Sequence, residues 1–184
     1  MINLRTISER WNRSAVRACT VSLLLAGLAA CSTLTSLAPQ DMVGAPITPI
    51  GHLGRGIGIP DFTVDGHSGG NNFGWGGGGS SSCCVLLPSK VMHPVMVTVK
   101  WSTYRSDVDE KRFHEALVPV HFELQPGEAG GLNVHFLPGH KVEVWVARTG
   151  SASPNYPGPT YPRGPAPRYV PLPGEKPALP VADN

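Results

Sequence analysis

The sequence predicts an all-β domain, a small antiparallel β-sandwich or barrel-like sheet, on three observations. Short runs of alternating apolar and polar residues recur through the middle of the chain. Turn-forming residues separate these runs, and the 184-residue chain holds 22 glycines and 19 prolines. No run repeats with the period of about 3.6 residues that marks an amphipathic helix. Closely spaced period-2 runs with turn residues between them are typical of all-β sandwiches and barrels.

The first 30 residues have the pattern of a bacterial lipoprotein signal. Four arginines precede an apolar stretch at 21–28, which is shorter than the roughly 20 residues that span a bilayer. The sequence Leu28-Ala29-Ala30-Cys31 then has the form of a lipobox. We therefore expect residues 1–30 to be removed and the Cys31 thiol to carry lipid. Ser32 follows, and resemblance to enterobacterial lipoproteins implies an anchor in the outer membrane that faces the periplasm.

Removal of this leader changes the charge of the chain. It takes away four of the 15 Lys and Arg residues and one of the 13 Asp and Glu residues, which leaves a net charge of −1. Nucleic-acid binders display a clear basic patch or stripe, so we expect no nucleic-acid partner. The remaining length allows one small domain rather than two.

Residues 31–50 contain several prolines and no periodic pattern, and we predict a disordered, flexible spacer there. The β domain is predicted at 51–148. Its first strands are expected within 57–64. After a turn at 65–66, the glycine-rich stretch at 67–82 is predicted to be a long loop, because glycine in a strand interior costs conformational entropy.

Four further strands are predicted from alternation alone. Apolar residues occupy every second position in the runs at 95–101, 118–124, 132–136 and 142–146. Between the first two of these runs, the polar stretch at 104–114 signals at most one helical turn. Residues 149–184 are crowded with proline and cannot form a strand ladder, so we predict a disordered Pro-rich tail.

After lipidation of Cys31 and removal of Cys19, only Cys83 and Cys84 remain as free thiols. A free pair is not expected to persist in an oxidising compartment. The pair can form a vicinal disulfide, bridge to a second chain, or keep one reduced and buried thiol. The absence of a Cys-x-x-Cys motif favours a structural role over a redox one.

The sequence offers His121, Glu123 and His135 as candidates for a metal site. They lie on the polar faces of two predicted strands, and across a hairpin they would present two imidazoles and a carboxylate, a set that zinc accepts. Solvent-facing polar residues on a half-exposed sheet explain them without a metal. We assign no metal, no cofactor and no catalytic residue, and we expect the protein not to be an enzyme.

The glycine run and the cysteine pair resemble a known family. The segments Phe62–Gly66, Gly69–Asn71, Gly76–Gly79 and Cys83–Pro88 are similar to a domain-of-unknown-function family of proteobacterial lipoproteins. The segments Val97–Trp101 and His135–Gly139 fit the same pattern. Members of that family are often encoded near type VI secretion components and phospholipase effectors.

The resemblance implies a periplasmic immunity protein, which would bind a secreted phospholipase and neutralise it. This function agrees with the predicted lipid anchor, since such a lipase attacks the membrane from the periplasmic side. The alternative is a structural envelope lipoprotein that contacts peptidoglycan or an outer-membrane complex through its Pro-rich tail.

Overall fold

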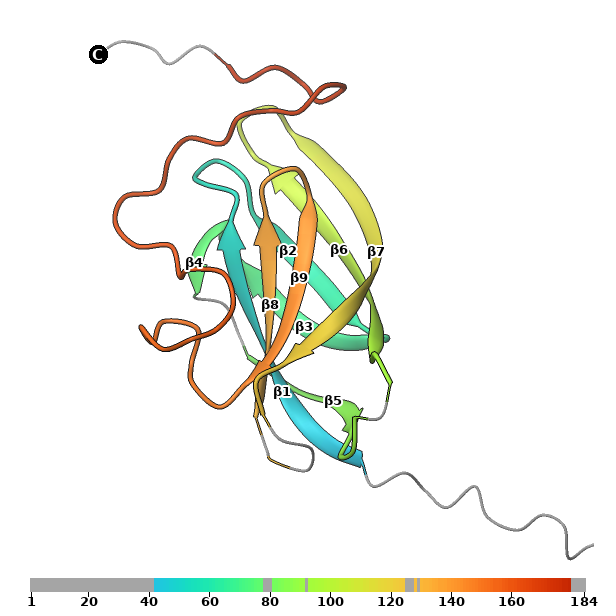
Figure 1. Ribbon diagram of the computed structural model, residues 1–184. Coiled ribbons are helices and arrows are strands. Elements are labelled where there is room, and N and C mark those ends of the chain that lie inside the picture. Colours follow the sequence, from blue (N-terminus) through green and yellow to red (C-terminus); the bar gives the residue numbers. More distant parts are fainter. Residues whose placement is uncertain (1–41, 78–80, 92, 125–127, 129, 180–184) are drawn as a thin grey trace, which may run out of the picture. The chain divides into compact units, whose positions relative to one another are not determined.

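The computed structural model describes residues 42–77, 81–91, 93–124, 128 and 130–179 (Figure 1). Cys31, the predicted leader and the first part of the predicted spacer lie outside these residues. The described residues form nine strands and no helix, which confirms the predicted all-β fold. Accordingly, this part of the chain has no helix with the length and apolar character that a membrane crossing requires.

The nine strands form one barrel-like sheet in the order β3-β2-β6-β7-β9-β8-β1-β4, and β5 also pairs with β1. Their bounds are β1 (Met42–His52), β2 (Ile59–Val64), β3 (His67–Asn72), β4 (Trp75–Gly77), β5 (Ser82–Pro88), β6 (Met96–Arg105), β7 (Glu110–Phe122), β8 (Gly131–Leu137) and β9 (Lys141–Ala147). Most neighbours are antiparallel as predicted, but β1 pairs with β8 and β7 pairs with β9 in parallel. The sheet is therefore mixed.

The two ends of this sheet come together because consecutive strands form them. β3 ends one side of the strand order and β4 ends the other, yet only Phe73 and Gly74 connect them. The buried Asn72 side chain holds this junction. Its Oδ1 accepts the Gly74 N–H at 2.7 Å, and its Nδ2 donates to the Gly76 carbonyl at 2.9 Å. The sheet is thus nearly closed, and Asn72 lies at its seam.

The glycine-rich stretch is not the long loop that the sequence predicts, because residues 67–72 and 75–77 form β3 and β4. The glycines here allow side chains and neighbouring backbone to pack closely. A Cβ atom on Gly69 would overlap the ring of Phe62, so the ring packs directly on the β3 backbone. Gly74 turns the chain with a φ of 88°, a conformation that costs glycine little.

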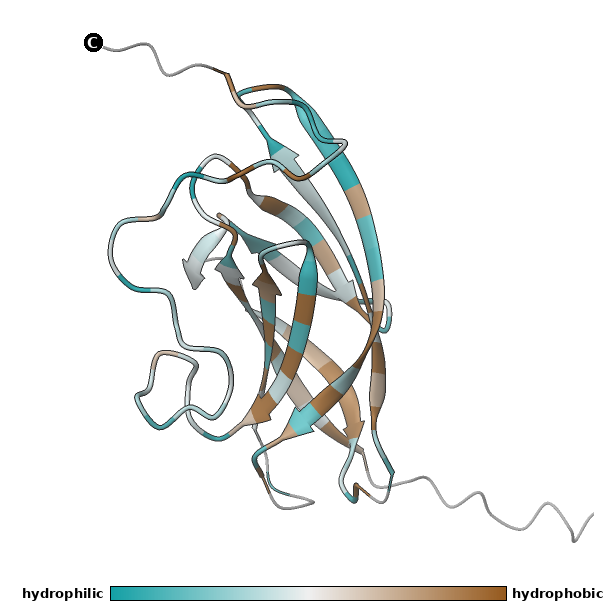
Figure 2. Ribbon diagram, turned by 45° about the horizontal axis from the view of Figure 1, so that its top comes forward, coloured by the Kyte–Doolittle hydropathy of each residue, from teal (hydrophilic) through white to brown (hydrophobic). Residues whose placement is uncertain are grey.

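The predicted alternation correctly identifies the core. The inward positions of the strands hold a continuous apolar cluster, visible as brown bands that alternate with teal along the strands (Figure 2). At its centre, the rings of Phe62 and Phe136 meet edge to face with centroids 5.1 Å apart. Aromatic pairs in this arrangement add to the stabilisation from burial.

Two predicted boundaries are wrong. The spacer prediction for 31–50 fails from Met42 onward, where β1 begins and buries Ala45, Ile47 and Ile50 despite its prolines. The polar stretch at 104–114 holds no helical turn. It completes β6 and starts β7, and its inward polar side chains are paired rather than solvated.

The predicted disorder of the Pro-rich tail is also wrong for residues 149–179, although the prediction that it forms no regular strand holds. This segment, called the C-terminal strap below, leaves the end of β9 and runs past β4 to the β6–β7 hairpin (Figure 1). It makes main-chain hydrogen bonds with Arg55 on either side of Arg168. Tyr169, at 8 % exposure, belongs to the buried core.

We expect Asn72→Ala to destabilise the domain by about 2–4 kcal/mol, because the buried Gly74 N–H and Gly76 carbonyl would lose their partners. Urea unfolding followed by tryptophan fluorescence measures this change. The exposed neighbour Asn71 provides the control, and Asn71→Ala should stay within about 0.5 kcal/mol of the wild type. Equal stability of the two variants would refute the role of Asn72 at the seam.

Candidate functional site

Three tyrosines attach the C-terminal strap to the sheet. The hydroxyl of Tyr156 lies 2.7 Å from Nε2 of His135 on β8. The hydroxyl of Tyr161 accepts the N–H of Gly77 on β4 at 2.7 Å. Tyr169 inserts into the core and donates to Glu175 at 2.8 Å. Each of the three rings thus ends in a polar atom that has a hydrogen-bond partner.

The first covered group is a chain of three rings, called the His135 relay below. Nδ1 of His135 lies 2.9 Å from Nε2 of His52 on β1, and its Nε2 contacts Tyr156. His135 is completely buried. A neutral imidazole donates from one ring nitrogen and accepts at the other, so both nitrogens are satisfied.

Burial governs the electrostatics of the relay. It lowers the pKa of His135 to about 3, and the neighbouring His52 lowers it further. Burial also lowers the pKa of His52 and raises that of the Tyr156 hydroxyl. All three rings are therefore neutral at pH 7, and the relay is suited to holding the strap in place.

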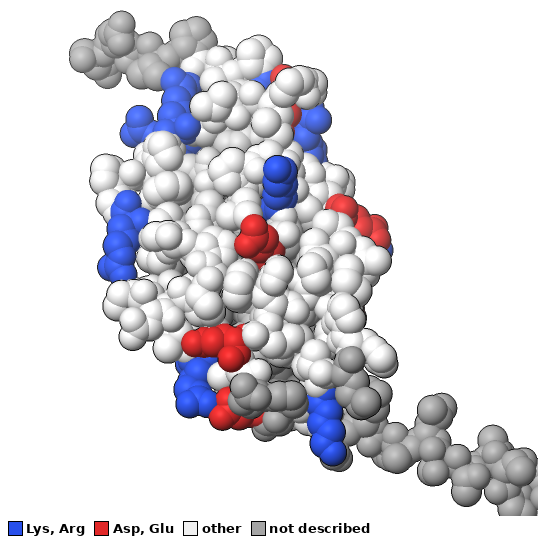
Figure 3. All heavy atoms as spheres, in the orientation of Figure 1, with Lys and Arg blue, Asp and Glu red and all other residues white. Residues whose placement is uncertain are grey.

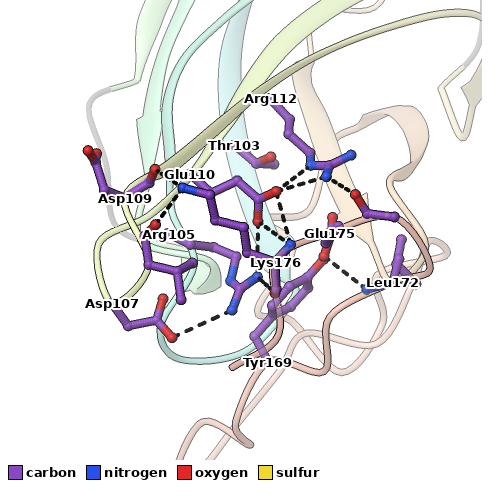
Figure 4. Close-up of polar contacts among 12 residues, drawn as sticks. Thr103, Arg105, Asp107, Asp109, Glu110, Arg112, Tyr169, Leu172, Glu175 and Lys176 are labelled. Carbon is purple, nitrogen blue, oxygen red and sulfur yellow. Dashed lines mark hydrogen bonds and ion pairs between the residues drawn. The ribbon is translucent and has the colours of Figure 1, made fainter. Parts of the chain in front are cut away.

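The second covered group, called the hairpin site below, lies where the strap reaches β6 and β7 (Figure 4). Arg105 donates to the Lys176 carbonyl at 2.6 Å and pairs with Glu110 at 3.1 Å. Glu110 accepts the Lys176 N–H, and Arg112 donates to both Glu110 and the Gly174 carbonyl. Burial alone would raise the pKa of Glu110, but these hydrogen bonds and the two arginine charges bring it below its ordinary value.

Histidines of the sheet continue the hairpin site. Nε2 of His140, in the β8–β9 turn, contacts the Glu175 carboxylate at 2.7 Å. The His140 ring lies 4.1 Å from that of His114, which stacks on Trp101. Burial lowers the pKa of His114 to about 4, with a further contribution from His140. For Glu175 burial opposes ionisation, yet hydrogen bonds from His140, the Leu172 N–H and Tyr169 lower its pKa.

The predicted metal candidates do not come together. β9 lies between β7 and β8, so His121 and His135 are not partners across a hairpin as the sequence suggested. His121 is exposed and stacks on Trp145, while both nitrogens of His135 are engaged in the relay. Glu123 accepts the Arg148 N–H at 3.2 Å. Within the described residues, no group of three His, Cys, Asp or Glu side chains is arranged to hold a metal ion.

The neighbouring cysteines have a simple arrangement. Cys83 and Cys84 are bonded to each other at the start of β5, the first of the three options open from the sequence. Cys83 is exposed, and Cys84 lies against Gly44 of β1. The pair therefore sits at the surface, away from both the relay and the hairpin site.

A third feature is an exposed surface, called the outer β6–β7 face below. Outward positions of the paired strands carry large apolar side chains: Met96, Tyr104, Phe113 and Leu117. Phe113 is 79 % exposed and Leu117 66 %. Ion pairs of Lys100 with Glu115 and of Lys111 with Asp61 lie among them. On the face drawn in Figure 3, charged residues of both signs are scattered over a mostly uncharged surface.

Sequence reasoning found His135 but missed most of these residues. Arg105, Glu110 and His114 lie in a polar stretch with no recognisable spacing, and their role depends on the strap. The tyrosines of the Pro-rich segment carried a usable signal. Amphipathic rings among prolines are suited to anchoring an extended segment on a surface.

Acid should destabilise the domain through His135. Its pKa of about 3 in the folded state lies below the ordinary 6.5, so the unfolded chain binds more protons between these values. Stability is therefore complete above about pH 6.5 and falls as the pH drops. In His135→Gln, the slope of unfolding free energy between pH 6 and 4 should decrease by about 1.4 kcal/mol per pH unit.

Urea unfolding at a series of pH values measures this slope. Asn133, a buried neighbour on β8 that does not titrate, provides the control, and Asn133→Ala should keep the wild-type slope. An unchanged slope in His135→Gln would show that His135 is protonated as readily in the folded protein as in the unfolded chain.

Comparisons with known proteins add one finding. No curated protein and no solved structure matches the chain. Residues 55–144 match the model of a family described as "Protein of unknown function (DUF3304)". The matched part runs from Arg55, whose main chain pairs with the C-terminal strap, to the middle of β9. It includes the outer β6–β7 face. The match supports the predicted resemblance to a domain-of-unknown-function family.

Proposed function

We propose that the mature chain is a non-enzymatic binding module, anchored by lipid at Cys31 to the periplasmic face of the outer membrane. Its partner in this proposal is a type VI secreted phospholipase effector, which it neutralises as an immunity protein. The anchor and the class of partner come from the lipobox and from the family resemblance. The observation that carries the binding role is the outer β6–β7 face.

That face has the composition of a protein-binding surface. Aromatic residues and methionine are enriched at interfaces, and an apolar patch rimmed by polar residues often marks one. Met96 lies opposite Pro119, and Thr98 opposite Leu117, so apolar side chains of both strands point the same way. The Lys100–Glu115 pair lies between Leu117 and Phe113 and supplies polar contacts.

The interior favours binding over catalysis. The titratable groups with strongly shifted pKa values, His114, His135, Tyr156 and Tyr169, all lie within the two groups that the strap covers. Their polar atoms take part in hydrogen bonds of the fold. These contacts favour a rigid domain that presents a surface.

The alternative, a structural envelope lipoprotein, depended on a free Pro-rich tail. Residues 149–179 are packed on the sheet through Tyr156, Tyr161 and Tyr169, so they offer no free tail for contact with the cell wall. No observation on the described residues favours this alternative over the binding module.

The outer β6–β7 face can be tested with a phospholipase effector encoded beside this gene. We expect the mature chain to bind that enzyme and inhibit it. Phe113→Asp combined with Leu117→Asp should weaken binding at least about 30-fold, the effect of losing about 2 kcal/mol at an interface hot spot. Calorimetry measures affinity, and survival of cells that produce the effector in the periplasm measures protection.

Leu86→Asp is the matched control, because Leu86 is also exposed, at 55 %, but lies on β5, which pairs with β1 rather than with β6 or β7. It should change affinity less than about threefold. If the wild-type chain does not bind the effector, the immunity proposal fails. If it binds and the double variant binds equally well, the partner stands but the outer β6–β7 face is not its binding site.

A further inference from the structure

We infer that a groove over the seam of the sheet, called the seam groove below, is a binding site for an uncharged saccharide. The groove is open to solvent and has a volume of about 450 Å³, within the range of about 300–1,000 Å³ that is usual for ligand sites. Ile57, Ile59 and Asn72 are its buried lining, and Phe73 and Tyr104 line it with exposed aromatic rings. Tyr104 also belongs to the outer β6–β7 face, but the inference does not depend on the partner proposed above.

The Phe73 ring is fixed in position without being buried. Hydrogen bonds hold the β3–β4 turn on both sides of this residue. The Asn72 side chain accepts the Gly74 N–H at 2.7 Å, and the Gly74 carbonyl accepts the Leu53 N–H at 2.8 Å. Phe73 is nevertheless 79 % exposed. Such a ring contributes little to the fold, whereas a fixed turn that presents it is suited to stacking on a ligand.

Tyr104 presents the second ring from the end of β6. Its main chain exchanges two hydrogen bonds with Gly58, both at 2.9 Å, which fix the residue beside the start of β2. Its hydroxyl donates to the Asp109 carboxylate at 3.2 Å, so the hydroxyl oxygen can still accept a hydrogen bond. Two aromatic rings from separate parts of the chain therefore line one groove in fixed positions.

Two unpaired polar side chains complete the lining. The Asn71 amide and the Ser106 hydroxyl form no hydrogen bond with another described residue. β2 carries an extra residue at this point, because Pro60 and Asp61 stand opposite Asn71 alone. Bulges of this kind re-aim side chains. None of the described residues that line the groove is charged, so its polar groups are an amide and hydroxyls.

A saccharide matches this combination better than other ligand classes do. One face of a sugar ring carries C–H groups that stack on the electron-rich face of an aromatic ring, and its edge carries hydroxyls that donate and accept. The Asn71 amide and the Ser106 hydroxyl also donate and accept. An ionic ligand would meet no opposite charge among the described lining residues, and an aliphatic ligand would cover these polar groups without pairing them. A Pro-rich peptide also stacks on aromatic rings, but its prolines have no N–H to donate.

The seam groove is accessible without movement of any described segment. Its described lining lies between residues 56 and 106, inside the family match at 55–144. No described residue of the C-terminal strap lines the groove, although the strap covers the His135 relay and the hairpin site. The groove is therefore a feature of the matched domain itself.

Titration of the 15N-labelled mature chain with soluble oligosaccharides tests the inference. The probes are tetrasaccharides of glucose, of mannose and of N-acetylglucosamine. At least one should shift the backbone amides of Gly58, Asn71, Phe73 and Tyr104 saturably, with a Kd at or below about 1 mM. If none shifts these amides at concentrations up to about 10 mM, the inference is overturned. Shifts of the same amides by a Pro-rich peptide alone would assign the groove to peptides instead.

Variants place the binding in the groove. Phe73→Ala should weaken binding of the responding saccharide at least about tenfold, because the stacking surface is lost. Asn71→Ala should weaken it at least about threefold, the effect of one lost hydrogen bond, while the stability of the domain is kept. Phe113→Ala is the matched control, because Phe113 is also 79 % exposed but lies outside the groove, and it should bind as the wild type does. Unchanged binding by Phe73→Ala, or equal weakening by Phe73→Ala and Phe113→Ala, would overturn the inference.

Discussion

Three buried polar side chains of the sheet, Arg105, Glu110 and His135, take partners from the C-terminal strap, and the packing of that strap on the sheet depends on this pairing. His135 lies on the outward side of β8, where an unpaired imidazole under a packed segment would be costly. Tyr156 supplies its partner. At the hairpin, Arg105 and Glu110 are buried because Lys176 completes their hydrogen bonds. A Pro-rich segment without strands is therefore an integral part of the folded domain.

The closure of the sheet has a different basis. β3 and β4 are consecutive in sequence and stand at opposite ends of the strand order, so a turn of Phe73 and Gly74 brings the ends together. Asn72 satisfies the backbone groups of that turn, and Gly69 lets the Phe62 ring contact the strand. At these positions the strands are irregular, and side chains pack closely against the backbone.

Alternation predicted the strands well where one face is buried and the other is exposed, as at Val95–Trp101 and Val142–Val146. It could not predict strand partners, because the alternating pattern of residues 118–124 is compatible with any neighbour. For that reason the sequence did not show that β9 separates His121 from His135. The Gly-rich stretch was misassigned since glycine signals both loops and close contacts. The strap was predicted to be disordered because its proline content shows that it cannot form a strand ladder. Composition does not show the tertiary contacts that hold the strap on the sheet.

The proposed role as a binding module rests on the outer β6–β7 face. The outer β6–β7 face offers exposed apolar side chains, of which Phe113 is the most prominent. The hairpin site on the inward side of the same two strands holds paired charges that bind the main chain of the C-terminal strap. The long β6–β7 pair, joined along ten residue positions, supports both.

The central claim is that residues 149–179 belong to the folded domain. Backbone {1H}–15N NOE values of the mature chain test it most directly, because they report motion on the picosecond-to-nanosecond timescale residue by residue. We predict values around Tyr156, Tyr161 and Tyr169 as high as those in β8 and β9. Low values throughout this segment, typical of a disordered tail, would contradict the account.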